Sequence, residues 1–157
     1  WLCALDNVML GARLRGEPQD RSRATALLAQ VGLADHPHKL PRRLSGGMRQ
    51  RVALARTLME DRPVVLMDEP FSAVDALTRM KLQDLSARLL AGRTVVMVTH
   101  DPMEAARLGT CVHVMSGSPA TLDDGFHPAG SVPRELADPE VADLHRTLLG
   151  KLELAVP

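Results

Sequence analysis

The sequence predicts an α/β fold with parallel strands, preceded by a small unit made only of helices. The four apolar residues 64–67 show no polar alternation, which is typical of a parallel strand covered on both faces. Residues 94–99 form a second predicted strand and 111–115 a third, and helices are predicted between them over 76–90 and 102–108. This order implies right-handed crossovers between parallel strands in an α/β layer.

The composition favours neither a nucleic-acid partner nor a membrane-spanning chain. The 157 residues include 19 basic and 19 acidic side chains, so no strong net field draws the chain to nucleic acid or to an anionic membrane surface. No apolar run approaches the length of about 20 residues that a spanning helix needs. Cys3 and Cys111 lack the spacing of a metal motif and are expected to be small buried hydrophobic residues of a reducing cytoplasm.

Residues 1–43 are predicted to form the helical unit. Asp6 is expected to cap a short helix, and residues 19–31 show helical apolar spacing that ends at Gly32. The apolar residues early in this unit exceed what so small a unit can bury, which predicts a docking surface. They are Leu2, Leu5, Val8, Met9 and Leu10.

The glycine spacing of residues 11–16 resembles a phosphate-binding P-loop but lacks its chemistry. Glu17 and Pro18 follow where Lys and Ser or Thr are required, and a carboxylate there would repel phosphate. We therefore reject this segment as a phosphate site.

Residues 44–51, Leu-Ser-Gly-Gly-Met-Arg-Gln-Arg, are typical of a helix start that can hold an anion. Ser45 can cap the helix. Gly46 and Gly47 are expected to leave backbone N–H groups uncovered where the helix dipole is positive, so that a phosphate can approach closely. A helix is predicted to continue to about residue 60.

Two carboxylates follow the first predicted strand, at the edge where open α/β sheets bind ligands. Asp68 is suited to hold Mg²⁺, because this hard cation prefers oxygen ligands. Glu69 can accept a proton from an attacking water. His100 comes directly after the second strand and can donate to a phosphate oxygen while a neighbour orients its ring.

Past residue 116 the pattern weakens through several glycines and prolines, and we expect a partly ordered extension. A final helix is predicted to begin at Asp138 or Pro139. Asp123, Asp124 and His127 are interpreted as a polar turn rather than as metal ligands.

Taken in order, these motifs resemble those of ATP-binding cassette (ABC) ATPases. Residues 44–51 are similar to the family's signature motif, 64–69 to its Walker B strand, 72–75 to its D-loop, and His100 to its switch histidine. The resemblance covers residues 1 to about 116. It implies a partial P-loop NTPase core of RecA-like type with parallel strands, plus a small all-α subdomain.

The same resemblance implies a division of the chain and of its site. The expected parts are a helical subdomain at 1–43, the signature helix and second half of the ATPase core at 44–116, and a carboxyl-terminal extension at 117–157. The implied cofactors are ATP and Mg²⁺. The implied site residues are Glu69 and His100 for catalysis, Asp68 for the metal, and Ser45, Gly46, Gly47 and Asp75 for nucleotide binding.

In that family two subunits pack head to tail, and each signature loop covers the ATP of its partner. Asp75 is expected at the subunit interface, and it can also cap the helix that follows.

The start of the chain resembles the segment after the Q-loop glutamine in nitrate, sulfonate, taurine and thiamine-precursor importers. We therefore expect the carboxyl-terminal portion of a bacterial ABC importer ATPase, inactive alone because it contains no P-loop.

The implied partners of the parent ATPase are a second ATPase subunit, a membrane permease and, indirectly, a periplasmic solute-binding protein, with no nucleic acid. Its implied location is the cytoplasm, at the inner face of the membrane. A non-transport ABC ATPase acting in DNA repair, chromosome organisation or translation, and a non-catalytic binding fragment, remain the alternatives.

Overall fold

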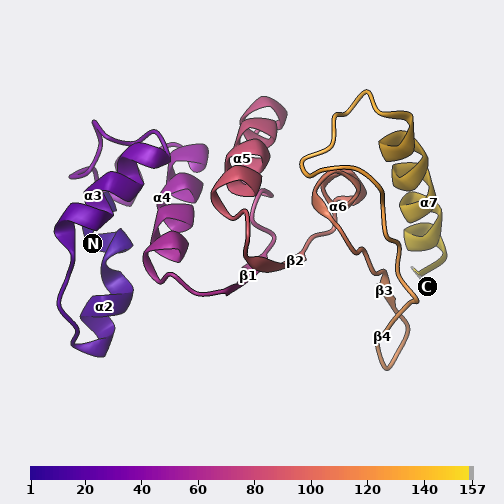
Figure 1. The fold of residues 1–157 in the computed structure, drawn as a ribbon, viewed down its shortest axis with the longest axis horizontal. Helices are drawn as coiled ribbons and strands as arrows, with labels where there is room; N and C mark the ends of the chain where they lie inside the picture. The colour runs from indigo at the N-terminus through magenta and orange to yellow at the C-terminus, as the bar shows by residue number, and fades with distance from the viewer. Residues whose placement is uncertain (156–157) are drawn as a thin grey trace. The chain divides into compact units, whose positions relative to one another are not determined.

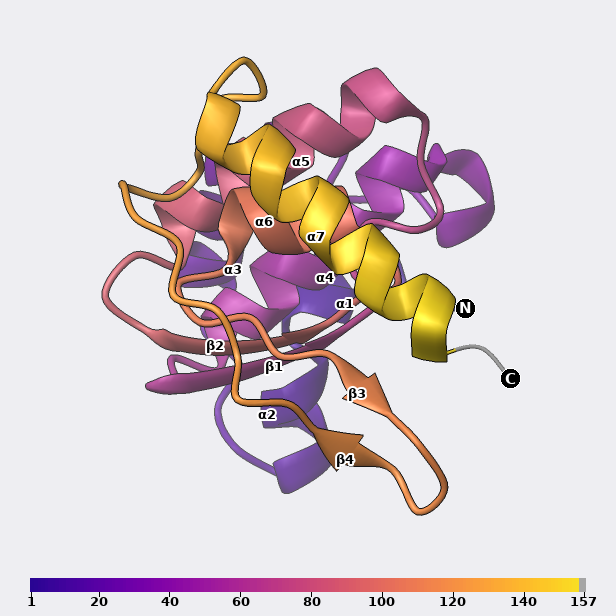
Figure 2. The same ribbon diagram turned by 90° about the vertical axis from the view of Figure 1, so that its right-hand side faces the viewer.

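The computed structural model describes residues 1–155, and the chain divides into two compact units, Trp1–Val98 and Thr99–Pro157. The first unit contains α1 (Ala4–Val8), α2 (Leu10–Arg15), α3 (Arg21–Gln30), the short 3-10 helix η1 (Pro41–Arg43), α4 (Gly46–Met59), β1 (Val64–Asp68), α5 (Ala76–Leu89) and β2 (Thr94–Val98) (Figure 1). The second contains α6 (Pro102–Leu108), β3 (Met115–Ser116), β4 (Thr121–Leu122) and α7 (Pro139–Ala155) (Figure 2). Within residues 1–155, no helix combines the length and the apolar character needed to cross a bilayer.

Helices α1, α3 and α4 pack together and supply much of the core of the first unit. Gly32 adopts a left-handed backbone, with a φ of 74°, where α3 ends, as the sequence predicted. The cap expected at Asp6 is wrong, because Asp6 lies inside α1, whose N-cap position is Cys3. Helix α2 contains Gly11 of the rejected P-loop segment and ends at Arg15, with Gly16 as its C-cap.

The docking surface predicted from the apolar residues near the start of the chain is wrong at Leu5, Val8 and Met9. Leu5, Val8 and Met9 are at most 3% exposed, because α1 packs against α3 and α4. These side chains serve the core of the unit and offer no surface to a partner.

Strands β1 and β2 are parallel and in register from Val64–Thr94 to Asp68–Val98, which confirms the predicted parallel pairing. The expectation that the first strand is covered on both faces is wrong for the described residues. Val65 is 5% exposed and packs with the helices, whereas Leu66 on the opposite face is 78% exposed. Successive side chains of a strand point to opposite faces, and within this unit helices cover only one of them.

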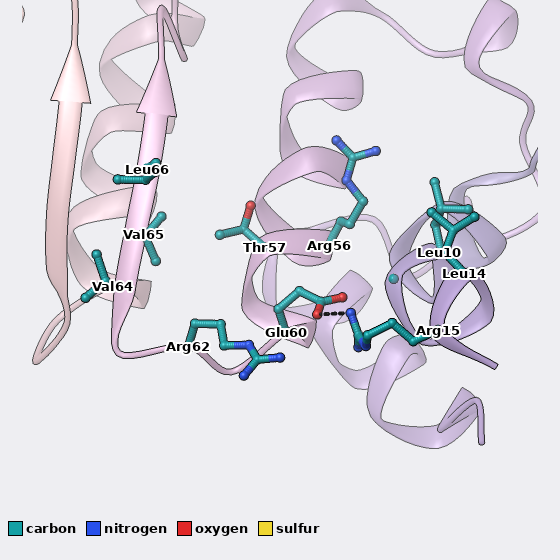
Figure 3. A pocket seen from close by; sticks show the side chains of 11 residues that line it. Leu10, Leu14, Arg15, Arg56, Thr57, Glu60, Arg62, Val64, Val65 and Leu66 are labelled. Carbon is teal, nitrogen blue, oxygen red and sulfur yellow. Dashed lines mark hydrogen bonds and ion pairs between the residues drawn. The ribbon is translucent and has the colours of Figure 1, made fainter. Parts of the chain in front are cut away.

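An open hollow of about 420 Å³ lies between α2, the end of α4 and the start of β1 (Figure 3). Leu10, Leu14 and Leu66 give it an apolar lining, and Arg15 pairs across one side with Glu60 at 2.7 Å. None of the predicted site residues lines this hollow.

The second unit has a different topology from the one predicted. The third strand, predicted at 111–115 and parallel, is wrong: β3 pairs antiparallel with β4, and an antiparallel bridge joins Val112 to Phe126. The chain reverses after β3 at Gly117, whose φ of 87° suits glycine. The segment therefore forms a hairpin instead of crossing over.

The final helix α7 is confirmed, and it packs on α6. Val141 and Leu148 of α7 join Ala106, Val112 and Val114 in the apolar core of this unit.

Arg134 connects the long segment before α7 to the rest of the second unit. It is only 4% exposed, and its guanidinium donates to the carbonyl oxygens of Ala106, Gly109, Pro128 and Ala129 at 2.6–3.1 Å. These bonds hold together segments of the chain that no shared helix or sheet connects.

Candidate functional site

The helix start predicted to hold an anion is present at α4. The Ser45 hydroxyl accepts a hydrogen bond from the Met48 amide at 3.2 Å, so Ser45 is the N-cap of a helix of 14 residues. Ser45 is exposed, Gly46 is half-buried and Gly47 is buried. The capping chemistry therefore agrees with the sequence, but the open approach expected at Gly47 is not found.

The structure gives the two glycines a packing role. A Cβ on Gly46 would lie 2.8 Å from the carbonyl oxygen of Ala73, and one on Gly47 would lie 2.6 Å from Cγ2 of Thr78. Both distances are too short for a real side chain. The start of α4 therefore lies directly against residues 73–78, which carry the predicted D-loop and the first turn of α5.

Asp75 lies in this contact region. Its carboxylate accepts from the Thr78 amide at 3.0 Å and caps α5, as one of its two predicted roles requires. Hydrogen bonding by the Thr78 backbone amide favours the ionised form and lowers the pKa of Asp75. The structure thus brings Ser45, Gly46 and Gly47 together with Asp75.

The two carboxylates form a second group, at the end of β1. Asp68 is the last residue of the strand and is exposed. Glu69 is half-buried and has a φ of 45°, a left-handed conformation that non-glycine residues seldom adopt. Its amide donates to the Val98 carbonyl at 2.9 Å, and its own carbonyl accepts from the Ser72 amide at 3.4 Å and the Ser72 hydroxyl at 3.1 Å. These bonds hold the strained backbone and turn Glu69 away from the strand direction.

His100 belongs to the second unit and lies, exposed, in the short turn before α6. The Thr99 hydroxyl donates to Glu104 at 2.8 Å and accepts from the Asp101 amide at 3.0 Å. Asp101 caps α6. The turn that carries His100 is therefore fixed on both sides by polar contacts.

Asp68 offers the donor chemistry that a magnesium ion requires. It is an exposed carboxylate, and Mg²⁺ is commonly held by one or two carboxylates while it keeps several waters. In the described part of the chain, no group of three or more His, Cys, Asp or Glu residues could hold a metal ion. Asp68 therefore fits a hydrated Mg²⁺ that also contacts phosphate, and it does not fit an ion held by protein ligands alone.

Sequence reasoning missed Ala73 and Thr78 as the residues that receive the two glycines. A signal was present, because small residues at the start of one helix permit the close approach of another segment. The sequence did not indicate which segment would occupy that space.

Comparisons with known proteins identify the class. The family model described as "ABC transporter" matches residues 3–72. An uncharacterized ABC transporter ATP-binding protein of Haemophilus influenzae is 46% identical over 97% of this chain and 65% of its own length. The aliphatic sulfonates import ATP-binding protein SsuB 2 of Burkholderia lata is 43% identical over 95% of this chain and 55% of its own length.

A solved structure supports the same assignment. The ATP-binding cassette MJ0796, a dimer in a post-hydrolysis state bound to ADP and Pi, superposes with a TM-score of 0.57 at 39% identity over 67% of this chain and 49% of that one. The fold is therefore that of an ABC ATPase. In sequence the chain is similar to ABC ATP-binding proteins, among them a sulfonate import protein, and it spans less than two thirds of the length of the two relatives named above.

Proposed function

We propose that this chain is the part of a bacterial ABC importer ATPase that carries the signature loop and the Walker B carboxylates. The observation that best supports ATP hydrolysis is the strained backbone of Glu69 directly after the exposed Asp68. Strain of this kind persists only where the surrounding structure enforces it, and it is concentrated at functional sites. The relative named for sulfonate import supports an importer.

In this proposal each residue at the strand end has a separate role. Asp68 would hold a hydrated Mg²⁺, and the chemistry that this ion would supply is neutralisation of charge on the phosphates. Glu69 accepts a proton from the attacking water, and His100 donates to an oxygen of the γ-phosphate. The different backbone directions at Asp68 and Glu69 allow one carboxylate to face a metal and the other a water.

The signature loop and the D-loop serve a second subunit. Ser45, Gly46 and Gly47 cover the nucleotide of the partner in a head-to-tail dimer, with Asp75 at the interface. The close packing of the glycines on residues 73–78 supports this arrangement, because the loop and the D-loop would then move as one piece. The dimeric state of the related cassette also supports it.

The remaining partners follow from the importer assignment. The dimer associates with a membrane permease at the inner face of the cell membrane, and a periplasmic solute-binding protein acts through that permease. The three-part division at 1–43, 44–116 and 117–157 belongs to this proposal.

The test is Glu69→Gln in the complete subunit. The amide keeps the shape of the side chain but cannot act as a base, so we expect ATP binding to persist and turnover to fall about 10²- to 10⁴-fold. Glu135→Gln is the matched control, since Glu135 is exposed and lies in the second unit. Near-normal turnover in Glu69→Gln would assign the base elsewhere, with His100 as the next candidate.

A further inference from the structure

A thiol lies between two imidazole rings in the second unit, outside the ATPase motifs. The antiparallel bridge between Val112 and Phe126 places the residues beside it on a common face. Cys111 Sγ lies 3.3 Å from His113 Nε2 and 3.8 Å from His127 Nε2. The prediction that Cys111 is a buried hydrophobic residue is therefore wrong, since Cys111 is exposed.

A hydrogen bond at the other side of its ring determines the tautomer of His113. His113 Nδ1 lies 2.9 Å from the carbonyl oxygen of Asp123. A carbonyl oxygen can only accept, so Nδ1 carries the proton and donates it. In the neutral ring Nε2 then has a free lone pair, and that lone pair faces the thiol of Cys111.

The residue opposite His113 leaves room for the ring. Gly125 has a φ of 82°, and a Cβ there would lie 2.6 Å from His113 Cε1. Asp123 holds the turn in place, because its Oδ1 accepts from the amides of Val114 and Gly125 at 3.0 and 3.1 Å and its Oδ2 accepts from Lys151 at 2.5 Å. The imidazole is therefore positioned by its surroundings.

These contacts form the arrangement of an activated nucleophile. A thiol lies within hydrogen-bond reach of a base, and a third group orients that base. A metal centre is the other use of Cys and His side chains. Within residues 1–155, however, no group of three or more such ligands could hold a metal ion. The geometry favours covalent chemistry at sulfur.

We propose that Cys111 is a site of thiol–disulfide exchange with small disulfides and that His113 is its base. The proton of Cys111 Sγ moves to His113 Nε2, and the resulting thiolate attacks one sulfur of the disulfide. A new S–S bond forms to Cys111, the disulfide S–S bond breaks, and the leaving thiolate takes the proton from the imidazolium. His127 lies beside the sulfur and stabilises the thiolate.

The other cysteine provides an internal comparison. Cys3 is half-buried, and its thiol donates to Asp6 at 2.9 Å. Burial, and next the hydrogen bond to Asp6, raises the pKa of Cys3. Cys3 therefore has a carboxylate that opposes thiolate formation where Cys111 has an imidazole that assists it.

The experiment uses the full chain, with 5,5′-dithiobis(2-nitrobenzoate) as chromogenic probe and oxidised glutathione as small disulfide. The rate of thiol modification is followed by absorbance, and peptide mass spectrometry assigns it to each cysteine. We expect Cys111 to react at least about tenfold faster than Cys3, and His113→Asn to slow Cys111 by about tenfold or more without changing Cys3. The Asn side chain keeps a donor for the Asp123 carbonyl and removes the base. His127→Ala should have a smaller effect, because its nitrogen is farther from the sulfur.

Two results would overturn the proposal. One is a rate at Cys111 that does not exceed the rate at Cys3. The other is an unchanged rate in His113→Asn. Circular dichroism of each variant checks that the fold is retained, and Cys111→Ser confirms the assignment of the fast phase. EDTA is present throughout, so that an adventitious metal does not shield the thiol.

Discussion

The first unit buries a continuous set of aliphatic side chains, whereas the second combines a small apolar cluster with buried charged groups. The first core includes Val8, Leu28 and Leu33, each at most 2% exposed, and it draws on helices and on β1. The second core is smaller and lies beside Arg107 and Arg134, each 4% exposed. Apolar burial is not directional, but a buried arginine stabilises only where hydrogen-bond acceptors meet its N–H groups. The two units should therefore respond differently to mutation.

The largest expected effect is that of Arg134→Met. Methionine keeps the apolar stem but leaves the carbonyl groups of Ala106 and Gly109, among others, without their donor. Each buried acceptor left unpaired costs roughly 1–3 kcal/mol, so we expect the second unit to lose about 4 kcal/mol. Hydrogen exchange followed by mass spectrometry should show α6 and α7 losing protection while α4 keeps it.

Arg146→Met is the control for this change. Arg146 lies on α7 with its side chain 76% exposed, and its ion pair with Asp143 should contribute less than about 1 kcal/mol. Equal loss of protection in α4 and α7 of Arg134→Met would show that the two units do not unfold separately.

Truncation in the first unit should have a somewhat smaller effect. Leu28 on α3 is 1% exposed, and Leu28→Ala removes buried methyl groups and leaves a cavity. We expect a loss of roughly 3 kcal/mol in the free energy of unfolding, measured by urea denaturation. Leu14→Ala is the matched control, because Leu14 is 78% exposed and its truncation should change stability by less than about 0.5 kcal/mol. A similar loss in both variants would contradict this view of the core.

The same contrast explains what the sequence could predict. Helix α4, its cap Ser45, the cap Asp75 and the parallel strands were predicted, because periodic apolar spacing and capping residues act over a few positions. Arg134 was missed. Its acceptors lie up to 28 residues away, so the chain path decides its role and no local pattern does.

Other errors have the same origin. The short segment predicted as a strand at 111–115 does not show whether it will cross over to a parallel sheet or fold back at Gly117. The backbone strain at Glu69 depends on bonds to Val98 and Ser72, which no spacing rule contains. Leu66 on β1 is exposed because no described element of the first unit covers that face of the strand, and the residues of the strand itself do not indicate this.

The smallest expected effects concern pH, and they separate two ways of stabilising a carboxylate. The pKa of Asp75 in the first unit is lowered mainly by the Thr78 amide, and the pKa of Asp123 in the second mainly by Lys151. Because each folded-state pKa lies below the unfolded value, the stabilisation is fully present above about pH 4 and is lost as the pH falls through the folded value. We expect Asp75→Asn to reduce this acid sensitivity in α5 and Asp123→Asn to reduce it in the second unit.

Salt should distinguish the two carboxylates, since about 0.5 M NaCl screens the exposed Lys151 pair but leaves the hydrogen bond from the Thr78 amide to Asp75 largely unaffected. Hydrogen exchange between about pH 5 and pH 2.5, at low and high salt, measures both. Equal salt sensitivity in the two units would contradict the separation, because it would mean that charge pairing governs both carboxylates.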